Sequence, residues 1–166
     1  MAGSDVVNIV IAGLGGQGVL KAADIVAGAA FRCGRDVKKS EIHGMSQRGG
    51  SVTSDVRYGA EVFSPMTPPG EADFLVVLSS DQVENNLWRL RPGGSLLGPD
   101  LVEAVRLASK KCLNVAMLGA LSLWTDLPEE QWLEEIRGSF PDKFHAVNLA
   151  AFREGRGAAA RVSQVL

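Results

Sequence analysis

The residues best suited to chemistry form two glycine-containing stretches in the N-terminal third of the chain. In the first, Gly13, Gly15 and Gly18 make a GxGxxG motif between an apolar stretch and a helical pattern, which is the context that this motif requires. The first glycine permits a tight turn, the second lets a phosphate approach the backbone, and the third lets helix and strand pack closely. The N-terminus of the helix adds unpaired N–H groups and a partial positive charge. The motif predicts an anion site, although a tight strand-to-helix turn alone would also need these glycines.

A nucleotide is the ligand class that this turn would suit, through Gly13, Gly15, Gly16, Gln17 and Gly18. A dinucleotide site should also have an acidic residue about 20 positions after the motif, to hold the ribose hydroxyls. Lys38 and Lys39 occupy that position instead, and the acidic residue Glu41 lies a few positions beyond it. Lysine favours a phosphate over a bare ribose, so the pattern indicates coenzyme A or NADP rather than NAD, unless the lysines are a solvated strand end. We add Lys38 to the predicted binding residues.

The second stretch, residues 41–50, is the densest cluster of polar side chains in the sequence. Arg48 can grip a carboxylate or a phosphate in bidentate fashion, and His43 can shuttle a proton. The alternative is a surface loop whose polar side chains contact only water. The residues expected to face an active site or an interface are Glu41, His43, Gly44, Gln47, Arg48, Gly49 and Gly50.

No catalytic or metal-binding constellation can be assembled from the sequence. There is no recognisable Ser/His/Asp or Cys/His arrangement, so we predict no catalytic residue on this chain. Cys33 and Cys112 stand alone in their neighbourhoods, whereas a zinc or iron–sulfur site needs about four ligands. We therefore expect no metal site here.

The elements that would position these residues alternate between strand and helix. Val6–Ala12 is β-branched and predicts a buried strand, and Val19–Arg32 predicts a helix with one narrow polar stripe. A second strand is expected over Asp36–Ile42. Ser51–Tyr58 alternates cleanly, which predicts a half-exposed strand, and Gly59-Ala60 would turn it back into Glu61–Phe63 as a hairpin.

The rest of the chain continues the pattern and ends in helices. Phe74–Leu78 predicts a central strand buried on both faces. It is followed by a short helix from Asp81 to Arg91 and a strand over Ser95–Gly98. The helices expected after that are Leu101–Lys110, Asn114–Trp124, Glu129–Arg137 and Pro141–Glu154, with Gly155 after the last and 155–166 as a tail that frays. This order predicts an α/β fold: a Rossmann-like three-layer structure whose mostly parallel sheet carries an inserted β-hairpin, with C-terminal helices.

Composition sets limits on partners and location. The chain has 166 residues, which fits a single domain over residues 1–166, and its net charge of -2 gives no footprint for nucleic acid. Val6–Ala12, the first apolar run, is far below the ~20 residues of a membrane span and lacks the basic start of a signal peptide. We expect no membrane association, and a cytoplasmic protein with reduced thiols.

The two glycine stretches in series resemble a known family. Gly-Leu-Gly-Gly-Gln-Gly-Val at 13–19 and Lys-Lys-Ser-Glu-Ile-His-Gly-Met-Ser-Gln-Arg-Gly-Gly-Ser-Val at 38–52 are similar to the gamma domain of 2-oxoacid:acceptor (ferredoxin) oxidoreductases. Within that family, the resemblance is to the small beta subunits of the indolepyruvate type. Segments 58–65, 71–73, 114–120 and 148–152 resemble later landmarks of the family. One departure is that the helix Leu101–Lys110 leads almost directly into Asn114, where the family has a further strand and connection.

The resemblance implies one component of a larger enzyme. Such enzymes oxidatively decarboxylate a 2-oxoacid, here an aryl one, to an acyl-CoA and pass electrons to ferredoxin. Thiamine diphosphate and the 4Fe-4S clusters would lie on a large alpha subunit, while this chain would shape the active site and contact coenzyme A. Alone, it would be inactive and could form a homodimer through its exposed partner face. Two alternatives remain open: a stand-alone NADP-binding reductase, and a non-catalytic module that stabilises a partner.

Overall fold

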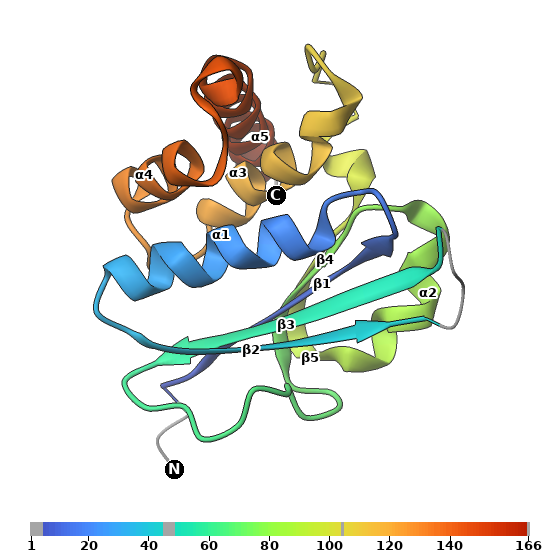
Figure 1. The fold of residues 1–166 in the computed structure, drawn as a ribbon. Helices are drawn as coiled ribbons and strands as arrows, with labels where there is room; N and C mark the ends of the chain where they lie inside the picture. The colour runs from blue at the N-terminus through green and yellow to red at the C-terminus, as the bar shows by residue number, and fades with distance from the viewer. Residues whose placement is uncertain (1–4, 45–48, 104, 166) are drawn as a thin grey trace.

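A computed structural model describes residues 5–44, 49–103 and 105–165, which form one mixed five-stranded sheet with helices on both of its faces (Figure 1). The strands lie in the order β2-β3-β1-β4-β5. Their bounds are Val7–Leu14 for β1, Asp36–His43 for β2, Ser51–Gly59 for β3, Ala72–Val77 for β4 and Leu90–Leu97 for β5. β1 pairs in parallel with β4, and β4 with β5, whereas β3 is antiparallel to both β1 and β2. Only β3 runs against the other four, so the predicted α/β fold with a mostly parallel sheet is confirmed.

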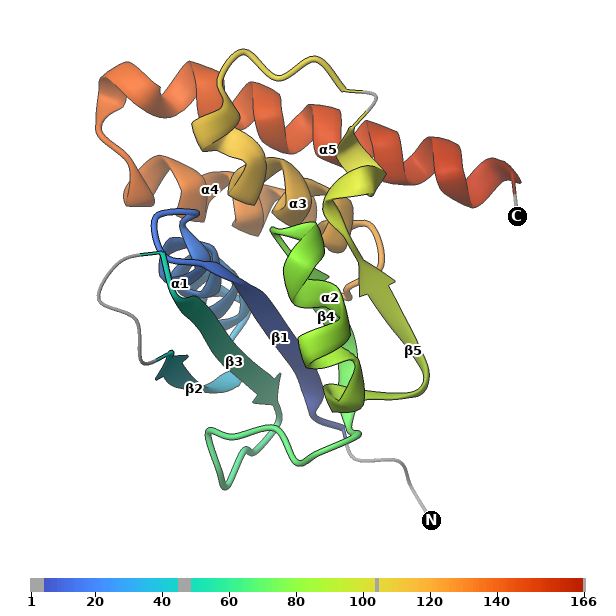
Figure 2. The same ribbon diagram turned by 90° about the vertical axis from the view of Figure 1, so that its right-hand side faces the viewer.

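The helices are distributed very unequally between the two faces of the sheet. The long helices, α1 (Val19–Arg32), α3 (Leu113–Ser122), α4 (Glu129–Ser139) and α5 (His145–Val165), all lie on one face. The other face carries the short α2 (Val83–Asn86), which is flanked by one-turn 3-10 helices, and the loop 60–71 (Figure 2). α3 lies between the sheet and α5, and its residues 114–122 are all buried, as expected for this helix.

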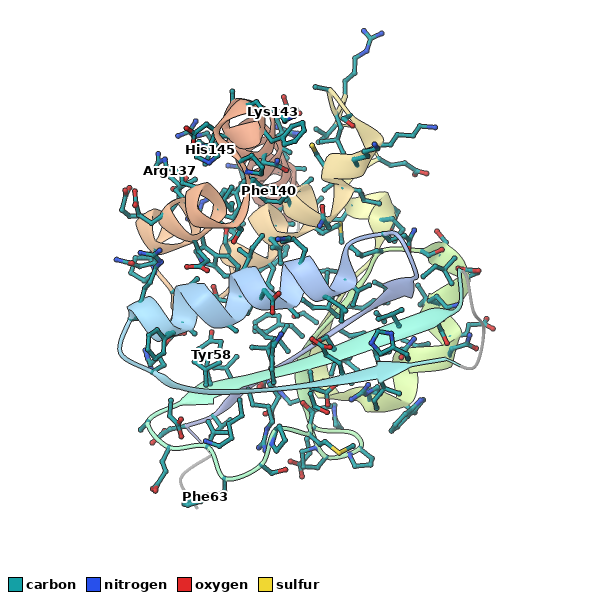
Figure 3. The ribbon with its side chains drawn as sticks, viewed as in Figure 1. Tyr58, Phe63, Arg137, Phe140, Lys143 and His145 are labelled. Carbon is teal, nitrogen blue, oxygen red and sulfur yellow. The ribbon has the colours of Figure 1, made fainter. Side chains whose placement is uncertain are left out.

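Two apolar clusters correspond to these two faces. The larger lies under α1 and α3 and includes Trp132 and Phe152, which are fully buried with ring centroids 6.1 Å apart. Tyr58 of β3 is also buried there (Figure 3); burial raises the pKa of its hydroxyl, which donates to Asp126 at 3.1 Å. The smaller cluster, on the α2 face, contains only five buried residues, among them Val10 and Leu75. The α2 face is therefore thinly covered.

Strand β3 differs from the half-exposed strand that its alternation predicts. It lies inside the sheet between β2 and β1, and Asp55, expected on the exposed face, is only 2% exposed. Its hairpin partner also differs, because β3 pairs antiparallel with β2, which precedes it in the chain. Glu61–Phe63 lies outside the sheet. The inserted hairpin thus exists, but its strands are β2 and β3.

Several predicted bounds are wrong. The short helical region expected from Asp81 to Arg91 ends at Arg89, and the strand expected over Ser95–Gly98 already begins at Leu90. The last helix begins at His145 rather than Pro141. In place of a helix over Leu101–Lys110, the structure has a one-turn 3-10 helix, Pro99–Val102, an irregular segment, and a second 3-10 turn, Lys110–Cys112. At the other end, Gly155 does not stop the last helix, since α5 continues to Val165. Ala158 and Ala159 are buried against the core. The segment expected to fray is therefore helical as far as Val165.

Candidate functional site

The first glycine stretch forms the turn between β1 and α1, at the carboxyl end of the central strand. Gly16 and Gly18 have φ angles of 89° and 80°, a region that L side chains rarely adopt. The side chain of Gln17 closes the turn: its Oε1 accepts from the Leu14 N–H at 2.8 Å, and its Nε2 donates to the Leu78 carbonyl at 3.4 Å. Gln17 therefore holds the turn against the end of β4.

The glycines of this turn are needed for different reasons. A Cβ on Gly13 would lie 2.8 Å from Oε1 of Gln17 and 3.2 Å from Cβ of Leu78, so packing excludes a side chain there. At Gly18 a Cβ would collide with Nδ2 of Asn114. At Gly16 a Cβ would meet no atom of the described residues within 4 Å, so among these residues only the positive φ disfavours a side chain. The backbone at Gly16 is therefore open to an incoming group.

The second glycine stretch meets the first at this edge of the sheet. The Gly15 N–H donates to the carbonyl of Gly50 at 2.8 Å, and a Cβ on Gly15 would lie 3.3 Å from the Gly49 nitrogen. Together with the turn, His43 and Val52 line a hollow of about 400 Å³. The structure thus places the two predicted stretches side by side. Gln47 and Arg48, which were predicted to face the same region, lie outside the described residues.

Other predicted residues lie away from the turn or are occupied in internal contacts. Lys38 is opposite Arg57 in the β2–β3 ladder, and its Nζ is 3.4 Å from Asp36; it lines neither hollow at the turn. The Glu41 carboxylate is 3.1 Å from the Lys39 ammonium, which also binds Asp24 of α1. Burial lowers the pKa of Lys39, but its bonds to the two carboxylates outweigh burial and raise the pKa above its usual value.

Gly44 is the last of the predicted residues, and His145 is the second histidine of the chain. Gly44 donates its N–H to the Ser51 carbonyl at 2.6 Å, where β2 leaves the hairpin. The His145 ring lies at the start of α5 with Nε2 2.7 Å from the Phe140 carbonyl oxygen (Figure 3), and it lines neither hollow. In the described part of the chain, no group of three or more His, Cys, Asp and Glu side chains is placed to hold a metal ion.

A second hollow, of about 350 Å³, opens on the other side of the turn and contains residues that the sequence analysis missed. Gly16–Gly18 form one wall, and Lys110, Lys111, Leu113 and Asn114 form the other. Asn114 fastens the walls together, because its Nδ2 donates to the Gly18 carbonyl at 3.2 Å. A sequence signal exists for these residues, since two adjacent lysines lie just before a helix that is polar only at Asn114 and Ser122. The helix expected over Leu101–Lys110 would place Lys110 at a helix end rather than at the start of the next helix, so the sequence analysis did not connect the lysines with the glycine turn.

The electrostatics of this second hollow favour an anion. α1 begins at Val19 and α3 at Leu113, so the N-terminal ends of two helices border the same space. Such ends carry partial positive charge and unpaired N–H groups. Lys110 and Lys111 are exposed and add two full charges. The residues present can therefore receive a phosphate group.

Comparison with known proteins identifies the family. Residues 8–158 match the family described as pyruvate ferredoxin/flavodoxin oxidoreductase. Subunit IorB of indolepyruvate oxidoreductase from Thermococcus kodakarensis is 37% identical, with 92% of this chain and 95% of the relative covered. The corresponding subunit from Pyrococcus horikoshii is 34% identical over the same shares. These alignments run over 194 positions, more than this 166-residue chain contains, so the relatives have additional residues.

Solved structures agree with the sequence relatives. The gamma subunit of a keto/oxoacid ferredoxin oxidoreductase from Geobacter sulfurreducens superposes with a TM-score of 0.78 at 25% identity, covering 93% of this chain and 99% of that one. A 2-oxoglutarate:ferredoxin oxidoreductase from Magnetococcus marinus has the same fold, with a TM-score of 0.80 at 22% identity; 96% of this chain matches 32% of that much longer one. No described helix is both long enough and apolar enough to cross a membrane. The chain therefore belongs to the pyruvate ferredoxin/flavodoxin oxidoreductase family, as an oxidoreductase subunit similar to IorB.

Proposed function

We propose that this chain is the small subunit of an indolepyruvate-type 2-oxoacid:ferredoxin oxidoreductase, and that its glycine turn binds a phosphate of coenzyme A. The observation that carries the second part is the 350 Å³ hollow, where Gly16–Gly18, two helix N-termini and two lysines converge. The Magnetococcus marinus enzyme of the same fold is described with coenzyme A and succinyl-CoA bound, which makes this nucleotide the first ligand to test.

In this proposal, the chain contributes binding and orientation rather than bond breaking. Thiamine diphosphate and 4Fe-4S clusters on a large alpha subunit would supply carbanion chemistry and electron transfer to ferredoxin, as an aryl 2-oxoacid becomes an acyl-CoA. Lys110 and Lys111 would hold the anionic end of coenzyme A, and the open backbone at Gly16 would let it approach. The hollow beside His43 lies across the same turn and would face the partner's active site.

An apolar patch supports the assembly with a larger subunit. Four large apolar side chains are exposed on the thinly covered α2 side, and we call them the apolar patch: Phe63 at 84%, Met66 at 52%, Leu87 at 44% and Trp88 at 60%. Asp55 ties their two segments together, because it accepts both from the Thr67 N–H and from Arg89. Exposed apolar surface of this kind is typical of protein interfaces. We assign the apolar patch to the large subunit, or to a second copy when the chain is alone.

The two alternative functions make different predictions for the same chain. A stand-alone NADP-binding reductase would use Lys38 for the extra phosphate, but the structure holds Lys38 beside Asp36 and outside both hollows. A non-catalytic stabilising module is compatible with the apolar patch, and it requires no nucleotide binding at all. Ligand binding by the full chain therefore separates the three functions.

The test is calorimetric titration with coenzyme A and with NADPH. It is done on the full chain alone and on the complex purified after co-expression with the large subunit. We expect coenzyme A to bind, and Lys110→Gln with Lys111→Gln to weaken it about tenfold, since two charged contacts to phosphate are lost. The matched control is Lys38→Gln with Lys143→Gln, which removes equal charge outside the hollow and should change affinity less than about twofold. Tight NADPH binding that depends on Lys38 would favour the reductase, and no binding of either nucleotide would favour the stabilising module.

A further inference from the structure

A further surface hollow, of about 440 Å³, lies along α5. It is lined by Val105 and Arg106 from the irregular segment before α3, and by Arg153, Glu154, Gly157 and Arg161 of α5. It shares no lining residue with either hollow at the glycine turn. Three of its six lining residues are arginines, in a protein whose net charge is -2.

These three arginines differ from the others in having no acceptor among the described residues. Each of the remaining described arginines donates a hydrogen bond to a carboxylate, an amide, a hydroxyl or a backbone oxygen: Arg32, Arg35, Arg57, Arg89, Arg91, Arg137 and Arg156. Arg106, Arg153 and Arg161 are exposed and make no such bond or ion pair in the described chain. A guanidinium offers five N–H donors in a planar fork that matches a carboxylate. The unused donors are therefore concentrated in one place.

Helix geometry arranges the charges as a row. Arg153, Gly157 and Arg161 are spaced four residues apart, so they share one face of α5, and the two arginines are about 12 Å apart along the axis. Gly157 keeps the floor of the row open, because a Cβ there would meet only Nη1 of Arg161, at 3.6 Å. Arg106 approaches from the neighbouring segment. A row of this length suits several carboxylates in sequence rather than one phosphate group.

We propose that this arginine hollow is a docking site for an acidic segment of a partner protein, one that presents Asp or Glu side chains along its length. Nothing in the hollow resembles the phosphate cradle at the glycine turn, because its floor is the middle of a helix. Glu154 on the rim would repel a uniformly anionic polymer or lipid surface more than a segment with spaced carboxylates. The arginine hollow needs neither coenzyme A at the glycine turn nor a partner on the apolar patch to bind such a segment.

The test uses the full chain and a fluorescently labelled peptide in which Glu residues alternate with Ser, with binding followed by anisotropy at low ionic strength. Arg153→Gln with Arg161→Gln should weaken binding about tenfold and flatten the salt dependence, since charged interface contacts are lost. The matched control is Arg32→Gln with Arg137→Gln, two arginines on α1 and α4 that lie outside the hollow. Because it removes the same charge elsewhere, it should change affinity less than about twofold. Urea midpoints of both double variants confirm that each protein is folded.

Three outcomes would overturn the proposal. The first is that wild type does not bind the peptide, and the second is that both double variants lose affinity equally, which would make the effect one of net charge. In the third, phosphatidylserine vesicles or a single-stranded oligonucleotide bind the wild type more tightly than the peptide and through the same two arginines. That result would assign the hollow to a membrane or a nucleic acid instead.

Discussion

At the scale of single residues, the carboxylate of Asp55 organises the α2 side of the sheet. It is 2% exposed, and its two oxygens lie 2.5 and 2.6 Å from Nη2 of Arg89, whose side chain is 6% exposed. One of these oxygens also accepts from the Thr67 N–H at 2.8 Å. A buried charge is tolerated only when it is paired and hydrogen-bonded. The pair therefore fixes both segments of the apolar patch on β3.

Removing one partner of this pair should be strongly destabilising. We expect Arg89→Leu to lower the free energy of unfolding by about 3–5 kcal/mol, because it leaves the Asp55 charge buried without compensation. Arg91→Leu is the matched control; its bond to Asp73 is half-exposed and should be worth at most about 1 kcal/mol. Urea denaturation followed by far-UV circular dichroism measures both. Equal losses in the two variants would show that the burial of Asp55 is unimportant.

Asp36 gives stability a pH dependence with a defined sign. Its carboxylate accepts from the Val62 N–H at 2.7 Å, and this bond, followed by the nearby Lys38, lowers its pKa below the ordinary 3.8. A depressed pKa in the folded state adds stability that is complete above the unfolded value and is lost as pH falls through the folded value. The difference in urea midpoint between wild type and Asp36→Asn should thus be constant above about pH 5 and shrink below 3.8. A difference that grows on acidification would contradict this sign.

At the scale of elements, the contact between α3 and α5 depends on two glycines that let the helix backbones touch. A Cβ on Gly119 would collide with the Phe152 carbonyl, and a Cβ on Gly155 would collide with the Ala116 carbonyl. Each glycine thus lies against the backbone of the opposite helix. This close approach explains how residues 114–122 of α3 can all be buried between α5 and the sheet.

Gly155 and Gly157 form a natural pair for testing this contact. Gly155→Ala should destabilise the protein by about 3 kcal/mol, because overpacking must push the helices apart. Gly157→Ala, two residues along the same helix, meets only Arg161 at 3.6 Å and should stabilise it by about 0.5–1 kcal/mol through helix propensity. Thermal unfolding measures both changes. A Gly155→Ala variant as stable as Gly157→Ala would mean that the two helices are further apart than described.

Local patterns predicted most of these elements, and the failures have physical causes. α1 begins at Val19 and ends at Arg32, as its polar stripe predicts. The prediction succeeds because the spacing of polar and apolar residues within the helix itself determines which face is buried. β3 looked half-exposed because alternation cannot reveal that Arg89, far along the chain, comes to cover Asp55. Gly155 predicts a helix end because glycine commonly terminates helices. Glycine also occurs within helices where two backbones pack closely, and the sequence alone does not separate the two cases.

The candidate site divides in the same way between local and long-range information. The glycine turn was predictable, since the motif and its strand–helix context are contiguous in the sequence. Sequence distance from the glycine turn predicts Lys38 as a phosphate ligand. Its actual place is on β2, where it is paired opposite Arg57. Lys111 and Asn114 reach the turn from nearly a hundred residues away, through a contact that only the fold creates.

At the scale of the whole molecule, the two inferred docking surfaces lie at opposite ends. Phe63 of the apolar patch marks one end and α5, with the arginine hollow, lies at the other (Figure 3). The glycine turn and its two hollows lie at an edge of the sheet between them. A partner on the apolar patch therefore need not compete with an acidic segment on α5.

The apolar patch makes a prediction about assembly. Phe63→Lys with Trp88→Lys should reduce co-purification of the large subunit more than about tenfold, because aromatic anchors carry a large share of interface energy. Phe31→Lys with Phe144→Lys is the matched control, since these aromatics are 74% and 45% exposed on other surfaces. Quantitative affinity purification after co-expression measures both, and sedimentation velocity of the chain alone reports any homodimer. Unchanged recovery with the first pair would place the interface elsewhere.

The central position of β1 has a consequence for synthesis on the ribosome. β1 is translated before both of its ladder partners, and β4, the second of them, ends at Val77, about halfway along the chain. At about 5–20 residues per second, its apolar stretch Ile9–Ala12 waits several seconds without a partner on either side. During that interval the nascent chain exposes an unpaired apolar segment that can aggregate. Chaperones that bind nascent chains on the ribosome should therefore improve the yield of this protein more than chaperones that act after the chain has left the ribosome.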